Sequence, residues 1–270
     1  MSDKKELKVK QNEVECGLIY PLEFHLTDHC NLGCKYCSHY SPVAEPRFAS
    51  MEEVRSAAAA VRVIKPKKLR LLGGEPLLHP NIDEIIRFFG ENISEKTDIY
   101  LITNGTLIKN MSDEFWELIK AHNITVYISI YPTKHDYNRM IETAREKGIA
   151  LSGIYNPRLK FFAINRSDDK RYDPENEYSK CETKCMQIRD EKLYPCPYSA
   201  YIEHINKRYG TEFIHMEGDY YKISEITDVN DVKEWMEIPK PFCAHCNYTG
   251  RTKVRWESTA KHEIEEWIEK

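Results

Sequence analysis

Three closely spaced cysteines are the most informative pattern in this chain of 270 residues. Cys30, Cys34 and Cys37 form a C-x3-C-x2-C arrangement after an apolar, strand-like stretch, with no fourth cysteine nearby. Cysteine thiolates hold iron-sulfur clusters, so three of them on a short loop could anchor a four-iron cluster and leave one iron open to another ligand. An open iron indicates chemistry rather than simple electron storage.

A zinc site is the alternative interpretation of the same three cysteines. A structural zinc ion is usually held by four ligands, and Asp28, His29 or His39 could supply the fourth. The cysteine loop alone does not separate the two metals. The motifs that follow it along the chain favour iron.

A glycine-rich segment, Gly73-Gly74-Glu75-Pro76, directly follows a predicted strand over 68–72. Glycine allows the backbone to approach a ligand closely, and the Glu75 carboxylate can accept a hydrogen bond from an ammonium group. By itself the segment is an ordinary turn. Its position after the second strand, downstream of the cysteine loop, is what indicates a ligand site.

Short apolar segments alternate with helical patterns, which is typical of strand-helix-strand units and a parallel sheet. The predicted strands span 18–26, 68–72, 98–102, 125–130, 150–155 and 159–164. The predicted helices span 51–64 after a Ser50 cap, 83–89, 112–122 opening with Ser112, and 134–147 ending at Gly148. Six units are too few for a closed eight-unit barrel. The fold class predicted is therefore α/β, a partial (β/α)6 TIM-like barrel, with ligands at the carboxyl ends of the strands.

The cysteine loop, its flanking Asn31, Gly33 and Tyr36, and the GGEP segment together resemble the radical S-adenosylmethionine (SAM) superfamily. In that family the open iron of a [4Fe-4S] cluster chelates the amino and carboxylate groups of SAM, and reduction cleaves SAM to methionine and a 5'-deoxyadenosyl radical. The resemblance implies that the GGEP segment binds the SAM amino group, that the ends of the third and fourth strands contact its ribose and carboxylate, and that Tyr36 packs near adenine or covers the cluster. The residues so implied are Tyr36, Gly73, Gly74, Glu75, Pro76, Thr103, Asn104 and Ser129. Outside this context, Asn104-Gly105 is an ordinary turn and Ser129 ends a strand.

A polar, charged stretch over 165–180 indicates a domain boundary, which divides the chain into 1–165 and 166–270. Five more cysteines follow it. A segment over 186–196 predicts a small hairpin, and 232–238 a helix. A distant cysteine together with a C-x2-C pair is typical of a fully ligated cluster or a zinc site. The five cysteines are Cys181, Cys185, Cys196, Cys243 and Cys246.

This second half resembles the twitch domain, the shortened form of the SPASM extension, which carries one auxiliary four-iron cluster on four cysteines. The resemblance implies Cys181, Cys196, Cys243 and Cys246 as ligands, with Cys185 as an alternate ligand or a hydrogen-atom donor. The roles of Cys181 and Cys185 could be reversed. Asp190-Glu191 stands where the hairpin usually has a glycine. Two [4Fe-4S] clusters and SAM are the cofactors expected.

Composition agrees with a folded chain that has one large core and a smaller unit, since 41% of the residues are hydrophobic. The charged N-terminus lacks the apolar core of a signal peptide, so we expect a cytoplasmic protein. Nine cysteines in a reducing compartment predict metal binding or catalysis rather than disulfides. No apolar run is long enough to span a membrane, and a net charge of -4 with interspersed signs predicts neither a membrane nor a nucleic acid partner. A C-terminal helix over 260–270 is expected to turn Ile264 and Trp267 inward.

The function predicted is removal of a hydrogen atom from a small polar substrate, such as a sugar, a cyclitol or a nucleotide-linked sugar. Loss of an electron to the auxiliary cluster gives dehydrogenation, whereas quenching by a thiol such as Cys185 gives epimerisation. Candidate bases are His25, Asp28, His29 and His39, although such histidines more often have a structural role. A flavodoxin- or ferredoxin-type electron donor is expected as partner. The alternatives are a maturase of a ribosomally made peptide and, from another class, a non-catalytic zinc-binding interaction protein.

Overall fold

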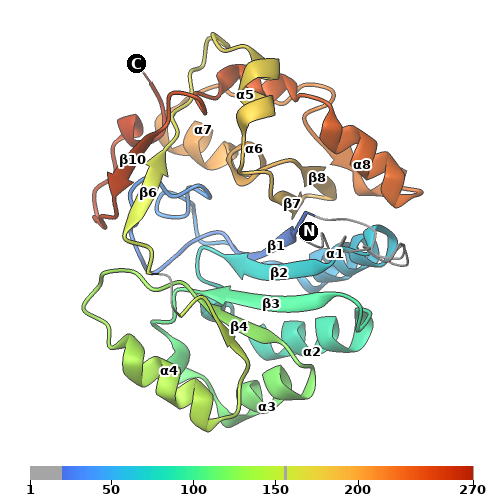
Figure 1. Ribbon diagram of the computed structural model, residues 1–270, viewed down its shortest axis with the longest axis vertical. Helices are drawn as coiled ribbons and strands as arrows, with labels where there is room; N and C mark the ends of the chain where they lie inside the picture. Colours follow the sequence, from blue (N-terminus) through green and yellow to red (C-terminus); the bar gives the residue numbers. More distant parts are fainter. Residues whose placement is uncertain (1–19, 155–156, 270) are drawn as a thin grey trace, which may run out of the picture.

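The computed structural model describes residues 20–154 and 157–269 (Figure 1). Its centre is an eight-stranded sheet with the strand order β5-β4-β3-β2-β1-β7-β8-β9. Neighbouring strands from β5 through β7 run parallel, whereas β8 and β9 are antiparallel additions. The strands are β1 (Leu22–Thr27), β2 (Lys68–Gly73), β3 (Asp98–Thr103), β4 (Thr125–Ile128), β5 (Leu151–Ser152), β7 (Met186–Arg189), β8 (Lys192–Tyr194) and β9 (Tyr221–Lys222). This parallel sheet with its helices confirms the predicted α/β partial barrel.

Four of the first five strands begin within one residue of the predicted position, at β2, β3, β4 and β5. The prediction for β1 began at Leu18, which lies outside the described residues, as does Tyr155 at the end of the prediction for β5. Alternate residues of a strand face opposite sides of the sheet. On β2, Leu69 and Leu71 are buried in the main core, while Lys68 and Arg70 line a cavity on the other side. The sequence alternation therefore separates a packing face from a ligand face.

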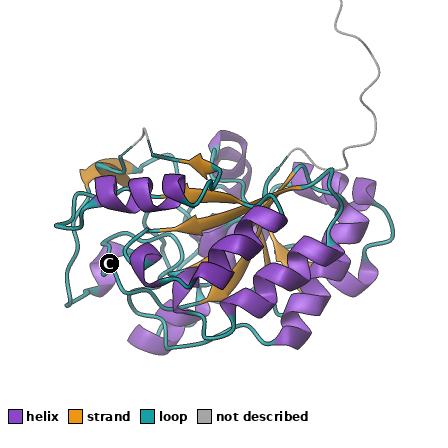
Figure 2. Ribbon diagram, turned by 90° about the horizontal axis from the view of Figure 1, so that it is seen from below, coloured by secondary structure: helices purple, strands orange, loops and turns teal. Residues whose placement is uncertain are grey.

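Helices cover the apolar face of this sheet (Figure 2). α1 (Met51–Ile64) has the predicted bounds, because Ser50 and Glu53 form a capping box around its first turn. α2 (Ile82–Asn92) begins one residue before its prediction and ends three residues after it, whereas α3 (Asp113–Ala121) lies within one residue of its prediction at both ends and is capped by Ser112. α4 (Tyr137–Glu146) begins three residues later than predicted, because Asp136 accepts a hydrogen bond from the backbone N–H of Arg139.

The predicted hairpin over 186–196 is present as β7 and β8. Its turn residues Asp190 and Glu191 have φ angles of 47° and 57°, the left-handed conformation for which glycine is the more usual residue. β7 lies parallel to β1, with Met186 opposite Leu22, so the sixth parallel strand is β7. The strand predicted over 159–164 forms β6 (Lys160–Ala163), which pairs instead with β10 (Thr252–Arg255) in a separate two-stranded antiparallel sheet. A central parallel strand is buried on both faces, and β6 exposes Lys160 and Phe162.

The rest of the chain lies beyond β1, in the upper half of Figure 1. It contains α5 (Pro174–Lys180), α6 (Pro197–Ala200), α7 (Glu203–Tyr209) and α8 (Val229–Glu237). The polar stretch after residue 165 includes Arg166, which is fully buried with its guanidinium 3.6 Å from the centre of the Tyr198 ring. In the described part of the chain, no helix combines the length and the apolar character needed to cross a membrane.

The helix predicted over 260–270 is wrong. Only Ile264–Glu266 form a short 3-10 helix, because the next residues pair with Arg166: the Arg166 N–H donates to the Trp267 carbonyl at 2.8 Å, and the Glu269 N–H donates to the Arg166 carbonyl at 2.8 Å. The predicted inward position of Trp267 is correct, since only 1% of it is exposed. Lys270 lies outside the described residues.

Candidate functional site

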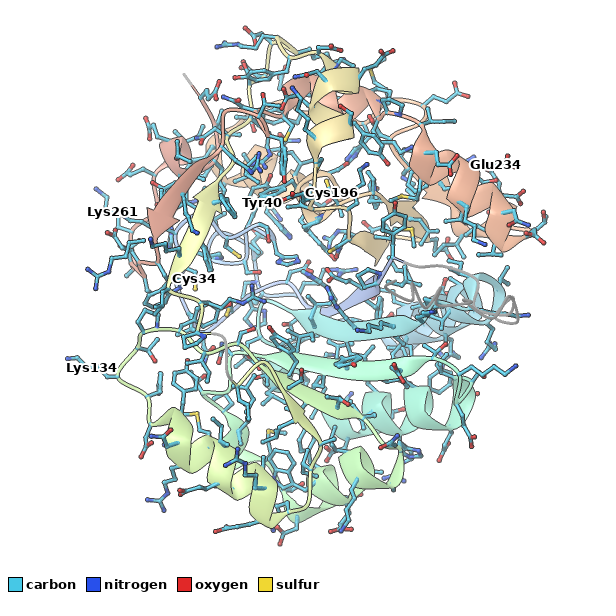
Figure 3. All side chains as sticks on the ribbon, in the orientation of Figure 1. Cys34, Tyr40, Lys134, Cys196, Glu234 and Lys261 are labelled. Carbon is cyan, nitrogen blue, oxygen red and sulfur yellow. The ribbon has the colours of Figure 1, made fainter. Side chains whose placement is uncertain are left out.

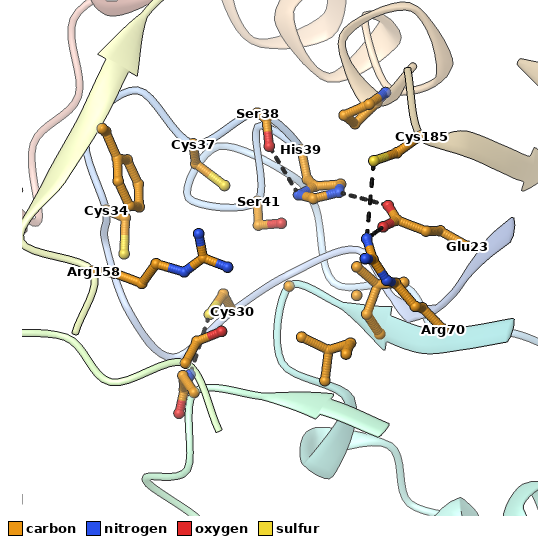
Figure 4. A pocket seen from close by; sticks show the side chains of 18 of the residues that line it. Glu23, Cys30, Cys34, Cys37, Ser38, His39, Ser41, Arg70, Arg158 and Cys185 are labelled. Atoms are coloured by element: carbon orange, nitrogen blue, oxygen red, sulfur yellow. Dashed lines mark hydrogen bonds and ion pairs between the residues drawn. The ribbon is translucent and has the colours of Figure 1, made fainter. Parts of the chain in front are cut away.

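A cavity of about 640 Å³ lies against the polar face of the sheet. Its walls are the inner faces of β1 to β4, the cysteine loop over 30–41, and residues between 158 and 198 from the second half of the chain. Figure 4 shows Cys30, Cys34 and Cys37 on one side of this cavity and Glu23, Arg70 and Cys185 on the other. Both predicted cysteine groups therefore contribute a thiol to the same space.

Cys30, Cys34 and Cys37 are free thiols that all line the cavity. The loop follows the end of β1, and the Gly74 N–H donates to the Thr27 carbonyl at 2.9 Å, which ties its start to the end of β2. Burial raises the pKa of Cys34 to about 12. Burial alone would also raise the pKa of Cys37, but His39 beside it brings this pKa below the usual value.

These thiols fit a cluster that takes one cysteine per iron. Among the described residues, no three His, Cys, Asp or Glu side chains come together closely enough to hold a single ion, and this applies to both groups of cysteines. The Arg158 side chain extends toward the three cysteines in Figure 4. Its guanidinium donates a hydrogen bond to the Tyr127 hydroxyl at 3.2 Å.

The end of β3 contacts the cysteine loop through Asn104. Its Nδ2 donates to Asn31 Oδ1 at 2.8 Å and lies 3.6 Å from Cys30 Sγ. Asn31 in turn donates to the Thr106 hydroxyl at 2.8 Å. Thr103, Asn104, Ser129 and Tyr36 all line the cavity, so the structure brings these predicted SAM contacts together with the cysteines.

The GGEP segment is only partly at the cavity. Gly73 and Gly74 line it, and both are required by close packing: a Cβ at Gly74 would lie 2.1 Å from the His29 carbonyl oxygen. Glu75 and Pro76 do not belong to the lining. The buried Glu75 carboxylate accepts hydrogen bonds from the Thr103 hydroxyl at 2.6 Å, the Asn104 N–H at 2.8 Å and the Leu77 N–H at 3.1 Å. In this arrangement Glu75 joins the ends of β2 and β3, and its contact with an ammonium group stays a prediction.

An ionic group around the buried Glu23 occupies the opposite side of the cavity. Arg70 Nη1 donates to Glu23 Oε1 at 2.7 Å and lies 3.9 Å from Cys185 Sγ, while His39 Nε2 is 4.0 Å from Glu23 Oε2. Burial would raise the pKa of Glu23, but His39, Gln187 and Arg70 lower it to about 2. Burial raises the pKa of Cys185 to about 12, so this thiol keeps its hydrogen at neutral pH.

Sequence reasoning missed Glu23 and Arg70. The available signal was a charged residue between two apolar neighbours in each of two strands, β1 and β2. Such a residue either faces solvent or faces a polar cavity, and strand alternation alone does not say which face is which.

The predicted bases separate into two groups. His39 lines the cavity, whereas His25, Asp28 and His29 do not. Asp28 is buried and accepts hydrogen bonds from Arg189 at 2.9 and 3.1 Å, and His25 stacks on Tyr201 with ring centres 4.0 Å apart. His29 packs edge-on against Phe48. Asp28 and His25 thus hold the start of the cysteine loop against the second half of the chain.

The other cysteines in the described part of the chain lie in that second half, and Cys181, Cys196 and Cys246 pack against the aromatic core around Tyr40; Figure 3 labels Cys196 and Tyr40 there. Burial raises the pKa of Cys196 well above its usual value, and the neighbouring Cys181, Cys243 and Cys246 raise it further. These four cysteines therefore lie within electrostatic range of one another. Cys185 instead faces Arg70 and Glu23 in the cavity.

Comparisons with known proteins agree with this geometry. Residues 24–153 match the family model of the Radical SAM superfamily. GTP 3',8-cyclase 1 of Mycobacterium tuberculosis (strain CDC 1551 / Oshkosh) is 31% identical over 98 residues, which cover 34% of this chain and 27% of that protein. The GTP 3',8-cyclase of Clostridium botulinum (strain Langeland / NCTC 10281 / Type F) is 26% identical over 259 residues, which cover 89% of this chain and 79% of that protein.

The stronger of these two sequence matches thus spans under a third of its relative's length. Among solved structures, that of BtrN in complex with AdoMet and 2-DOIA superimposes with a TM-score of 0.53 at 14% identity, covering 85% of this chain and 93% of that chain. At this identity the likeness concerns the fold alone.

Proposed function

Residues 24–153 belong to the radical SAM superfamily, and from this premise we propose an enzyme that replaces a hydrogen atom on a carbon of a small polar substrate. Cys30, Cys34 and Cys37 would hold the [4Fe-4S] cluster, with SAM beside Tyr36, Gly73, Gly74, Thr103, Asn104 and Ser129. When bound, the reduced cluster and SAM supply a 5'-deoxyadenosyl radical that removes a hydrogen atom from an unactivated carbon. The net reaction proposed is epimerisation.

The position of Cys185 carries this proposal. Its thiol lines the cavity opposite the cysteine loop, whereas the other four cysteines of the second half do not belong to the lining. Donation of a hydrogen atom requires S–H rather than thiolate, and burial keeps this sulfur protonated. After Cys185 donates its hydrogen atom to the substrate carbon, the sulfur radical must take up one electron and one proton. We propose that a cytoplasmic donor of flavodoxin or ferredoxin type supplies the electron.

The substrate class proposed is a sugar, a cyclitol or a nucleotide-linked sugar. Glu23 and Arg70 offer an acceptor and a donor for hydroxyl groups on one side of the cavity. The lining also holds Lys68, Arg158 and Lys160, which suits the phosphates of a nucleotide-linked sugar. The two relatives described above are also named for a nucleotide, GTP.

We propose that Cys181, Cys196, Cys243 and Cys246 hold an auxiliary [4Fe-4S] cluster in a C-terminal unit over 166–270. The support is their mutual proximity beside a buried aromatic core. Such a cluster could exchange electrons with the cavity.

Dehydrogenation is the second candidate, and the His39–Glu23 pair favours it. Oxidation of an alcohol carbon requires a base near the substrate, and His39 lies on the cavity wall with the Glu23 carboxylate 4.0 Å away. Burial lowers the pKa of His39, but Cys37 and Glu23 together raise it to about 9, so His39 holds its proton at neutral pH and can serve as the base only as the pH approaches 9.

The experiment that separates the candidates is turnover in D2O. Anaerobically reconstituted protein is incubated with SAM, dithionite and one of four probes: UDP-glucose, UDP-N-acetylglucosamine, GTP or scyllo-inosamine. Epimerisation gives a product one mass unit heavier, because the Cys185 hydrogen exchanges with solvent. Dehydrogenation gives a product two mass units lighter.

The matched variant is Cys185→Ser. We expect it to retain SAM cleavage to 5'-deoxyadenosine and to lose the deuterated product. If the deuterated product persists, Cys185 is not the donor. Cleavage that occurs only with a ribosomally made peptide would favour a maturase. A colourless protein that contains zinc and no iron would instead favour the interaction protein.

A further inference from the structure

The C-terminal segment over 256–259 packs directly against the cysteine loop. Cys34 and Ser258 form an antiparallel bridge. The Lys35 N–H donates to the Glu257 carbonyl at 3.0 Å, and the Thr259 N–H donates to the Gly33 carbonyl at 2.8 Å. The loop is thus paired, along its backbone, with a segment more than 200 residues away in the sequence.

Gly33 shows how closely the two segments fit. A Cβ at this position would lie 2.0 Å from the carbonyl oxygen of Thr259, closer than any real contact. The glycine within the C-x3-C motif is therefore required here by the C-terminal segment.

Trp256 makes the most specific contact of this segment. Its indole Nε1 donates to Cys34 Sγ at 3.3 Å. The ring stacks on Tyr131 with centres 5.6 Å apart and an interplanar angle of 22°, and its backbone N–H donates to the Leu159 carbonyl at 2.9 Å. Only 8% of Trp256 is exposed, so the indole N–H is held toward the sulfur in a site with little water.

We infer that Trp256 is a positioning residue that raises the reduction potential of the cluster bound through Cys34. The inference rests on the proposed function, since it requires a cluster on Cys30, Cys34 and Cys37. Hydrogen bonds to the cysteine sulfurs are one of the factors that set the potential of an iron-sulfur cluster. Reduction adds negative charge to the cluster and its thiolates, so an N–H donor stabilises the reduced state more than the oxidised state.

The test compares Trp256→Phe with the natural protein. Phenylalanine keeps an aromatic ring against Tyr131 and removes the N–H. Iron per chain is measured first. The protein is then titrated anaerobically with a reductant, and the reduced cluster is followed by electron paramagnetic resonance. The cluster of interest is the one whose signal changes when SAM is added. At a fixed solution potential we expect the ratio of reduced to oxidised cluster to fall roughly threefold to tenfold, tenfold corresponding to about 59 mV.

Trp235→Phe is the matched control. Trp235 is also 8% exposed, and its indole donates to the Gly218 carbonyl at 3.0 Å, on α8 and away from the cysteine loop. This variant should leave the potential unchanged. If Trp256→Phe loses iron, 3-benzothienylalanine at position 256 keeps the two-ring shape and replaces the N–H by sulfur.

The outcomes separate the two hypotheses. A lower potential at equal iron content supports the inference. An unchanged potential, in Trp256→Phe with full iron or in the benzothienyl protein, overturns it and leaves the proposed function intact. Natural protein without iron overturns the proposed function itself.

Discussion

Cys181 and Cys185 are four residues apart in the sequence, yet they have different surroundings. Cys181 lies among Cys196, Cys243 and Cys246, whereas Cys185 lies beside Arg70 at 3.9 Å. We therefore expect Cys181→Ala to lose about four irons per chain and Cys185→Ala to keep them. Iron analysis of anaerobically reconstituted protein measures the difference. The reverse pattern would assign the auxiliary cluster to Cys185 and remove the proposed hydrogen donor.

The buried carboxylate of Glu75 makes the stability of the folded protein depend on pH. Burial raises its pKa from 4.5 to about 7, although its three hydrogen-bond donors oppose this shift. The native state then binds the Glu75 proton more tightly than the unfolded state does. This residue's contribution to the free energy of unfolding therefore falls as the pH rises from about 4.5 to about 7.

The variant Glu75→Gln tests both the hydrogen bonds of the Glu75 carboxylate and its titration. Its amide NH2 cannot accept the hydrogen bond from the Asn104 N–H, and leaving a buried donor unpaired costs about 1–3 kcal/mol. Its free energy of unfolding should be lower and should change less between pH 5 and pH 7.5, as measured by urea titration. A variant with the same pH dependence as the natural protein would show that Glu75 does not titrate in this range.

At the scale of elements, strand β7 is tied to the end of β1 by Arg189 and Asp28. The two side chains are buried and form two parallel hydrogen bonds at 2.9 and 3.1 Å. Removing one partner of a buried ion pair costs about 3–5 kcal/mol when the other charge is left unpaired. Because Arg189 keeps its contacts with Glu203 and Asp190, the expected cost is at the low end, about 3 kcal/mol. We expect Asp28→Asn to destabilise the protein by this amount in urea titrations.

Asp168→Asn is the matched control for that change, because it makes the same substitution at an exposed position away from Arg189. It should alter stability by no more than about 0.5 kcal/mol. Equal effects of the two substitutions would mean that the ion pair does not hold the hairpin to the barrel.

Helices and strands that are determined by neighbouring residues could be predicted from the sequence, whereas the elements that they pair with could not. Ser50 and Glu53 lie within one helical turn, so the start of α1 was predictable to the residue. β6 was recognised as a strand, but its pairing with β10 depends on residues about 90 positions away. Likewise the cysteines were identifiable by type and spacing, whereas the contact of Trp256 with Cys34 spans 222 residues and leaves no sequence pattern.

At the scale of the whole molecule, the two predicted units share one sheet and one core. β7 comes after residue 166 and pairs with β1 near the middle of the sheet. Ile188 of β7 and Val232 of α8 belong to the same buried cluster as Leu101 of β3. The cavity likewise takes its walls from both halves of the chain. The boundary near residue 165 therefore marks a change in sequence pattern, but side chains from both sides of it pack in the same buried cluster.

This shared core predicts a single cooperative unfolding transition. Leu101→Ala and Ile188→Ala lie in different predicted units, and each removes a buried side chain worth about 2–5 kcal/mol. By differential scanning calorimetry, each variant should shift the same single transition to lower temperature, whereas Ile238→Ala, at a side chain 59% exposed, should shift it little. Two transitions, with Leu101→Ala moving one and Ile188→Ala the other, would mean that the halves fold independently. In that case the cavity between them would depend on docking of two folded units rather than on one continuous sheet.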